Sequence, residues 1–128
     1  MTDRLVGDWI PAYLDYTSGT EAPRLMHFWA GVSCIAACLR RKVWIDMKRF
    51  QWYPNFYIIF VAPPGIISKT TTMDMGMDLV KNVPGIKFGP DVVTWQALVT
   101  AFAGAQEEFQ YGEDFVPMSP ITLASGEL

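Results

Sequence analysis

The chain has 128 residues, of which 51% are apolar and 18% charged, and its formal net charge is −3. This composition is typical of one globular domain and excludes disordered and coiled-coil classes. No apolar stretch approaches the roughly 20 residues that span a bilayer, and the first ten residues lack the basic-then-apolar order of a secretory signal. We therefore expect a cytoplasmic protein with no membrane partner.

The N-terminal third of the sequence predicts two helices. Residues 3–15 have the apolar spacing of a short amphipathic helix, which we expect Pro11 to interrupt. From Arg24 to about residue 39, apolar side chains recur at helical spacing again. Arg40, Arg41 and Lys42 then complement the negative end of this second helix.

The only two cysteines and the only histidine lie in this second helical segment. Cys34 and Cys38 are four residues apart, so they occupy successive turns of one apolar face. We interpret them as buried reduced thiols rather than metal ligands, because no nearby residues supply two further ligands. His27 is more typical of a core or rim residue than of a catalyst.

Basic residues are concentrated after the second helix, between residues 40 and 49, among and beside the aromatic side chains Trp44, Trp52 and Tyr53. Five of the ten Lys and Arg residues lie there: Arg40, Arg41, Lys42, Lys48 and Arg49. Such a segment could follow a nucleic-acid backbone, but it is more typical of a solvated helix end that runs into an edge strand. The first alternative predicts that Arg40 and Arg41 contribute to the salt dependence of DNA binding.

The rest of the chain alternates predicted strands and helices. A short strand at 43–46 precedes the apolar run 56–62, which has the composition of a central parallel strand. A helix follows from about residue 69, and another begins after Asp91 or Thr94 as its N-cap. We expect further strands at 86–89 and 121–124 and a loop at 110–120. This order predicts an α/β domain with a mainly parallel sheet.

The segment "NFYIIFVAPPGIISKTTTMDMG", residues 55–76, has the strand, turn and helix that a phosphate-binding loop requires. Lys69 and Thr70 match the last two positions of the pattern G-x-x-x-x-G-K-[ST], while Pro63 and Ser68 replace its glycines. The alternative is a plain turn with a solvated lysine. Because hydroxyls cluster in the first helical turn, where threonine is a mediocre helix former, we favour phosphate binding.

The predicted nucleotide site is the loop 63–70 with the residue after it. We expect the backbone N–H groups from Gly65 to Thr70 to face one anion at a helix N-terminus. The predicted binding residues are Pro64, Gly65, Ile66, Ile67, Ser68, Lys69, Thr70 and Thr71.

The ordered motifs "YPNFYIIFVAPPG", the lysine followed by threonine, and "ITLASGEL" resemble the N-terminal part of P-loop ATPases of phages and mobile elements, which include replicative helicases and primase-helicases. The resemblance implies a P-loop NTPase-like (RecA/AAA-type) partial parallel sheet at 51–128, behind a helical lead and first short strand at 1–50. It also implies ATP and Mg²⁺ as cofactors, Thr70 and Glu127 as metal residues, and Glu127 as the catalytic residue. DNA, a homo-oligomeric ring and the cytoplasm of a bacterial host would then be the partners and location.

Two departures from the family pattern bear on activity. Ser68 brings a Cβ to a position where the backbone approaches phosphate, and Gly126 stands where an aspartate commonly precedes the glutamate. We expect a fragment or a truncated product that binds nucleotide without appreciable turnover, because no arginine finger is evident. A nonenzymatic assembly module with a degenerate loop is the main alternative. A small-molecule phosphotransferase is disfavoured because no arginine-rich lid follows the loop.

Overall fold

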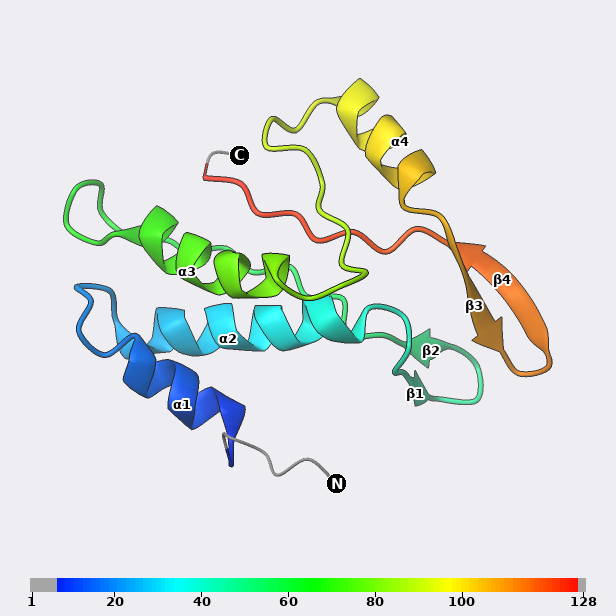
Figure 1. The fold of residues 1–128 in the computed structure, drawn as a ribbon, viewed down its shortest axis with the longest axis horizontal. Coiled ribbons are helices and arrows are strands. Elements are labelled where there is room, and N and C mark those ends of the chain that lie inside the picture. The colour runs from blue at the N-terminus through cyan, green and yellow to red at the C-terminus, as the bar shows by residue number, and fades with distance from the viewer. Residues whose placement is uncertain (1–6, 127–128) are drawn as a thin grey trace.

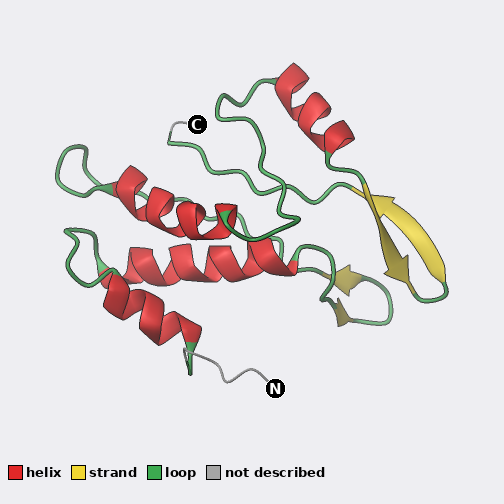
Figure 2. Cartoon of the chain, in the orientation of Figure 1, coloured by secondary structure: helices red, strands yellow, loops and turns green. Residues whose placement is uncertain are grey.

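The structure is a computed structural model that describes residues 7–126, and it consists of helices linked by long extended segments and two small hairpins (Figures 1 and 2). In the described part of the chain the helices and strands are, in order, α1 (Trp9–Tyr16), α2 (Arg24–Leu39), β1 (Ile45–Asp46), β2 (Gln51–Trp52), α3 (Lys69–Lys81), α4 (Trp95–Gly104), β3 (Glu107–Tyr111) and β4 (Asp114–Met118). Within residues 7–126, no helix is both long and apolar enough to cross a membrane.

The expected P-loop NTPase-like parallel sheet is wrong for this chain. Between residues 7 and 126 the strands form two separate antiparallel pairs, β1–β2 and β3–β4. Residues 56–61 are extended, as their composition predicts, but they make no backbone hydrogen bond to another described segment. A β-strand needs an extended backbone and also a neighbouring strand within hydrogen-bonding distance. The apolar pattern predicts the extended backbone but not the neighbouring strand.

A single parallel contact joins the segments that we expected to be strands at 86–89 and 121–124. Phe88 and Thr122 form an isolated bridge, in which Gly89 N–H donates to the Thr122 carbonyl over 2.9 Å. Thr122 N–H donates in turn to the Lys87 carbonyl over 2.9 Å. A Cβ at Gly89 would overlap the end of the Leu123 side chain, which would have to move to make room for it.

The core lies between α2 and α3, which pack along each other, with α1 against the other side of α2 (Figure 1). Cys34 of α2 and Met77 and Val80 of α3 form its buried centre. Phe88 and Ala124 of the paired segments pack against that centre, so the bridge at Phe88 and Thr122 sits on the α2–α3 layer.

The helices agree with the sequence better than the strands do. The expected helix after Arg24 is confirmed as α2, and the helix after residue 69 is α3. The Thr94 hydroxyl accepts a hydrogen bond from Ala97 N–H over 3.2 Å, which confirms the alternative that made Thr94 the N-cap of α4. Pro11 does not interrupt α1, because it lies in the first turn, where its missing N–H is not needed.

The expected loop at 110–120 is wrong, because most of it belongs to the β3–β4 hairpin. Arg40 ties this hairpin to the helices: its guanidinium is 2.7 Å from the Glu107 carboxylate and donates to the Gly85 carbonyl over 3.0 Å. The guanidinium therefore links the end of α2 to β3 and to the turn after α3.

Candidate phosphate-binding loop

The loop 63–68 connects the extended segment 56–62 to α3 and is largely exposed. Gly65 adopts a φ of +75°, and no atom lies within 4 Å of the position that a Cβ would take there. The requirement for glycine at Gly65 is therefore conformational rather than steric. The turn it makes brings the chain to the N-terminus of a 13-residue helix.

The N-terminus of α3 has unsatisfied backbone donors, as an anion site requires. Ser68 is the N-cap residue, but its side chain makes no capping hydrogen bond. The backbone N–H groups of Thr70 and Thr71 have no backbone partner in the described residues, because the first α-helical bond runs from Thr72 N–H to the Ser68 carbonyl over 3.1 Å. Free N–H groups and the helix dipole together favour an anion at this end.

One predicted donor is already engaged. Lys69 N–H donates to the Ile67 carbonyl over 2.9 Å, so it does not contribute to an anion site in this conformation. The donors that remain in the predicted range are those of Gly65 to Ser68 and of Thr70, for which the structure records no backbone partner.

The Lys69 side chain folds back over the loop. Its ammonium donates to the Ala62 carbonyl over 2.9 Å, which joins the last residue before the loop to the first residue of α3. The side chain is half-buried, and an ammonium has three N–H donors, so two remain for another acceptor. Lys69 thus carries a positive charge at the loop instead of extending into solvent.

The "ITLASGEL" segment reaches the same place in space. A Cβ at Gly126 would lie 3.8 Å from the Thr70 hydroxyl, so the end of the described chain lies beside the first turn of α3. The structure therefore brings together the Lys-Thr pair and the segment in which we expected an acidic motif. Glu127, the predicted catalytic and metal residue, lies outside the described residues. Among residues 7–126, no group of three or more His, Cys, Asp or Glu side chains is placed to hold a metal ion.

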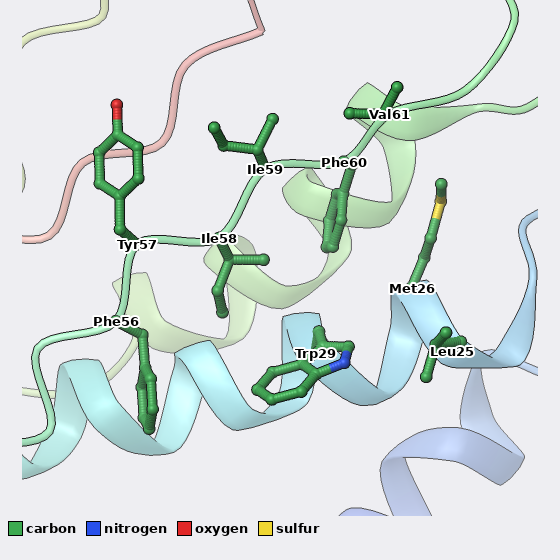
Figure 3. Close-up of a pocket in the computed structure, with 9 residues that line it drawn as sticks. All are labelled: Leu25, Met26, Trp29, Phe56, Tyr57, Ile58, Ile59, Phe60 and Val61. Carbon is green, nitrogen blue, oxygen red and sulfur yellow. The ribbon is translucent and has the colours of Figure 1, made fainter.

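An apolar groove of about 590 Å³ lies next to this region, between the N-terminal half of α2 and the extended segment (Figure 3). Its lining residues share an apolar or aromatic character and are Leu25, Met26, Trp29, Phe56, Tyr57, Ile58, Ile59, Phe60 and Val61. Such a lining offers shape and apolar surface but no acid, base or nucleophile for neutral-pH chemistry. The groove is therefore a binding surface at most.

Buried titratable groups lie within the helical core, where Cys34 and Tyr13 both approach Gly76 of α3. Burial raises the pKa of the Tyr13 hydroxyl to about 12, with a smaller contribution from Cys34. Burial also raises the pKa of the Cys34 thiol to about 11, with Cys38 adding to the shift. Both groups are neutral and unreactive near pH 7. Cys34 is buried as expected, whereas Cys38 is exposed, so the prediction of two buried thiols is half right.

Comparison of the chain with protein-family models, with curated proteins and with solved structures found no match.

Proposed function

We propose that the loop 63–70 binds the phosphates of a nucleoside triphosphate, with ATP and Mg²⁺ as the expected ligands. The observation that carries the proposal is the Lys69 ammonium folded over a glycine-containing loop at the uncapped N-terminus of α3. Thr70 follows it in the exposed first turn of α3, where its hydroxyl would supply an oxygen ligand to Mg²⁺. The proposal depends on the loop and α3 and does not require a parallel sheet.

Binding of this kind involves the Lys69 side chain and the backbone donors of the loop. The ammonium exchanges its bond to the neutral Ala62 carbonyl for a bond to an ionised phosphate oxygen, in which donor and acceptor are both charged. The backbone donors of the loop and of Thr70 then complete the anion shell. The wider assignment to a DNA-replication ATPase comes from the sequence motifs. The proposal made from the structure is nucleotide binding.

We expect calorimetry to show Mg-ATP binding by the wild-type chain and at least about tenfold weaker binding by Lys69→Ala, because a hydrogen bond to a charged group contributes about 1.5–3 kcal/mol. Lys87→Ala is the matched control, since Lys87 is an exposed lysine outside the loop. Its affinity should equal that of the wild type. Both variants should keep the free energy of unfolding within about 1 kcal/mol.

Equal affinities of Lys69→Ala and Lys87→Ala for Mg-ATP would refute the proposal, as would the absence of binding by the wild-type chain. The second candidate function, a nonenzymatic assembly module, is favoured by the apolar groove along α2. It predicts self-association that depends on protein concentration and is unaffected by Mg-ATP, which sedimentation velocity measures directly.

A further inference from the structure

The β1–β2 hairpin presents one face of exposed apolar side chains. Ile45 pairs with Trp52, so their side chains point to the same side, and Met47 and Phe50 lie two residues further along on that side. These four residues are between 52% and 66% exposed. The Phe50 and Trp52 rings lie 6.1 Å apart with an interplanar angle of 51°, so both keep ring surface open to solvent.

The opposite face of the hairpin is occupied by its own contacts. Trp44 and Tyr53 lie 6.3 Å apart, and the Arg41 guanidinium lies 4.4 Å from the centroid of the Tyr53 ring. A cation over an aromatic ring stabilises this side and fixes Arg41 next to the strands. The open rings are therefore those of Phe50 and Trp52.

The tip of the hairpin is positively charged. Lys48 and Arg49 form the turn, and Lys48 has a φ of +66°. Asp46 is the only carboxylate between residues 40 and 53, and it accepts a hydrogen bond from the Lys48 backbone N–H over 2.8 Å. This bond positions the turn; the Lys48 and Arg49 side chains make no ion pair with any described carboxylate.

The charge of this segment contrasts with the rest of the chain. Residues 40–53 contain five Lys or Arg residues and one Asp, a net charge of +4 within a chain of net charge −3. The remaining residues therefore carry −7. Of the five cations, Arg40 is used internally in its ion pair with Glu107, and Arg41 lies over the Tyr53 ring. Lys42, Lys48 and Arg49 make no ion pair with a described carboxylate. The partner that fits the free cations and open rings is an anionic polymer that also carries flat aromatic groups.

We propose that the β1–β2 hairpin binds single-stranded nucleic acid, with bases stacked on Phe50 and Trp52 and phosphates on Lys48, Arg49 and Lys42. Stacking on aromatic side chains beside a basic track is the general physical basis of sequence-tolerant single-strand binding. The surface does not include Arg40, whose guanidinium is paired with Glu107, so the proposal differs from the expectation that Arg40 and Arg41 contribute to the salt dependence of DNA binding. It is also separate from the loop 63–70, so either proposal can fail without the other.

The charged tip argues against a membrane as the partner. A hairpin that enters a bilayer does so through its turn, but the turn here consists of Lys48 and Arg49, and burying charged side chains in hydrocarbon is costly. An acidic protein segment would satisfy the cations but would leave the Phe50 and Trp52 rings without flat partners. Single-stranded nucleic acid satisfies both features.

The test is fluorescence anisotropy with a labelled oligothymidylate of about 16 nucleotides and the full 128-residue chain. Trp52→Ala should weaken binding by about 5- to 150-fold, the range that corresponds to loss of one base stack. Trp95→Ala is the matched control, because Trp95 is 76% exposed on α4, outside the hairpin. It should bind within twofold of the wild type, and Trp52→Phe should restore most of the lost affinity.

Salt dependence separates phosphate contacts from other effects. The double variant Lys48→Gln/Arg49→Gln should lower the slope of log K against log salt by about 1.4, since each phosphate contact to a single strand contributes about 0.7. Lys87→Gln should leave the slope unchanged. Equal losses for Trp52→Ala and Trp95→Ala, an unchanged slope, no oligothymidylate binding, or tighter binding to phosphatidylserine vesicles or to polyglutamate would each overturn the proposal.

Discussion

His27 is a buried histidine in which one ring nitrogen lacks a hydrogen-bond partner among the described residues. Its side chain is 2% exposed and its Nε2 atom contacts the Thr20 hydroxyl, while its Nδ1 atom has no partner in the described residues. The Thr20 hydroxyl donates to the Thr17 carbonyl over 2.9 Å, so its oxygen is left to accept from Nε2–H. The imidazole is therefore neutral, and protonation would place a charge on a buried Nδ1 atom that has no acceptor.

We expect this arrangement to destabilise the fold at acidic pH. Burial lowers the pKa of His27 below its ordinary value of 6.5, so below about pH 6.5 the unfolded chain binds a proton that the folded chain resists. The free energy of unfolding should fall as pH decreases from 7 to 5 and be constant on this account above pH 7. Thermal unfolding of wild type and His27→Gln across this range measures the effect.

His27→Gln should reduce the pH dependence of unfolding between pH 7 and 5, whatever its effect on stability at pH 7. The same slope in both proteins would show that His27 titrates normally in the folded state.

The packing of α2 against α3 depends on a small residue at the contact. Gly76 of α3 faces Cys34 of α2, and a Cβ at Gly76 would lie 2.9 Å from the Cys34 sulfur and 3.4 Å from the Tyr13 hydroxyl. Real Cβ atoms do not approach a sulfur atom so closely, and all three residues are buried. The two helices can keep this distance only with glycine at position 76.

Gly76→Ala should therefore destabilise the protein by about 1–3 kcal/mol, the usual cost of overpacking a core. Gly104→Ala is the control, because Gly104 ends α4 with no atom within 4 Å of a Cβ, and alanine there should be neutral or slightly stabilising. Urea unfolding of both variants distinguishes the two environments. A Gly76→Ala variant as stable as Gly104→Ala would mean that the helices separate without cost.

At the scale of elements, the sequence predicts the helices well because their apolar spacing reports the face that each helix buries. Strands are predicted less well, because an apolar run indicates an extended backbone but not which segment it pairs with. Residues 56–61 are extended but pair with no other described segment. The β3–β4 hairpin could have been found, because Gly112 and Glu113 form a two-residue turn with a φ of +63° at Gly112. Pro117 in β4 obscured it, although proline is tolerated in an edge strand.

At the scale of the whole molecule, two surfaces of different chemistry lie at separate places on one helical layer. The loop 63–70 has fixed backbone donors and one lysine, and the β1–β2 hairpin has open rings and free cations. The Lys-Thr spacing was visible in the sequence, because a lysine at a helix start is a local feature. The ion pair that removes Arg40 from the basic surface could not be seen in the sequence, because its partner Glu107 is 67 residues away along the chain.

The most direct measurement of phosphate binding is an NMR titration of the ¹⁵N-labelled chain with Mg-ATP. We expect the backbone amides from Gly65 to Thr71 to shift in the wild type, with those of β3 and β4 unchanged, and these shifts to be lost in Lys69→Ala. Shifts confined to the apolar groove residues 25–29 and 56–61, or no shifts at all, would contradict the proposal that this loop binds nucleotide phosphates.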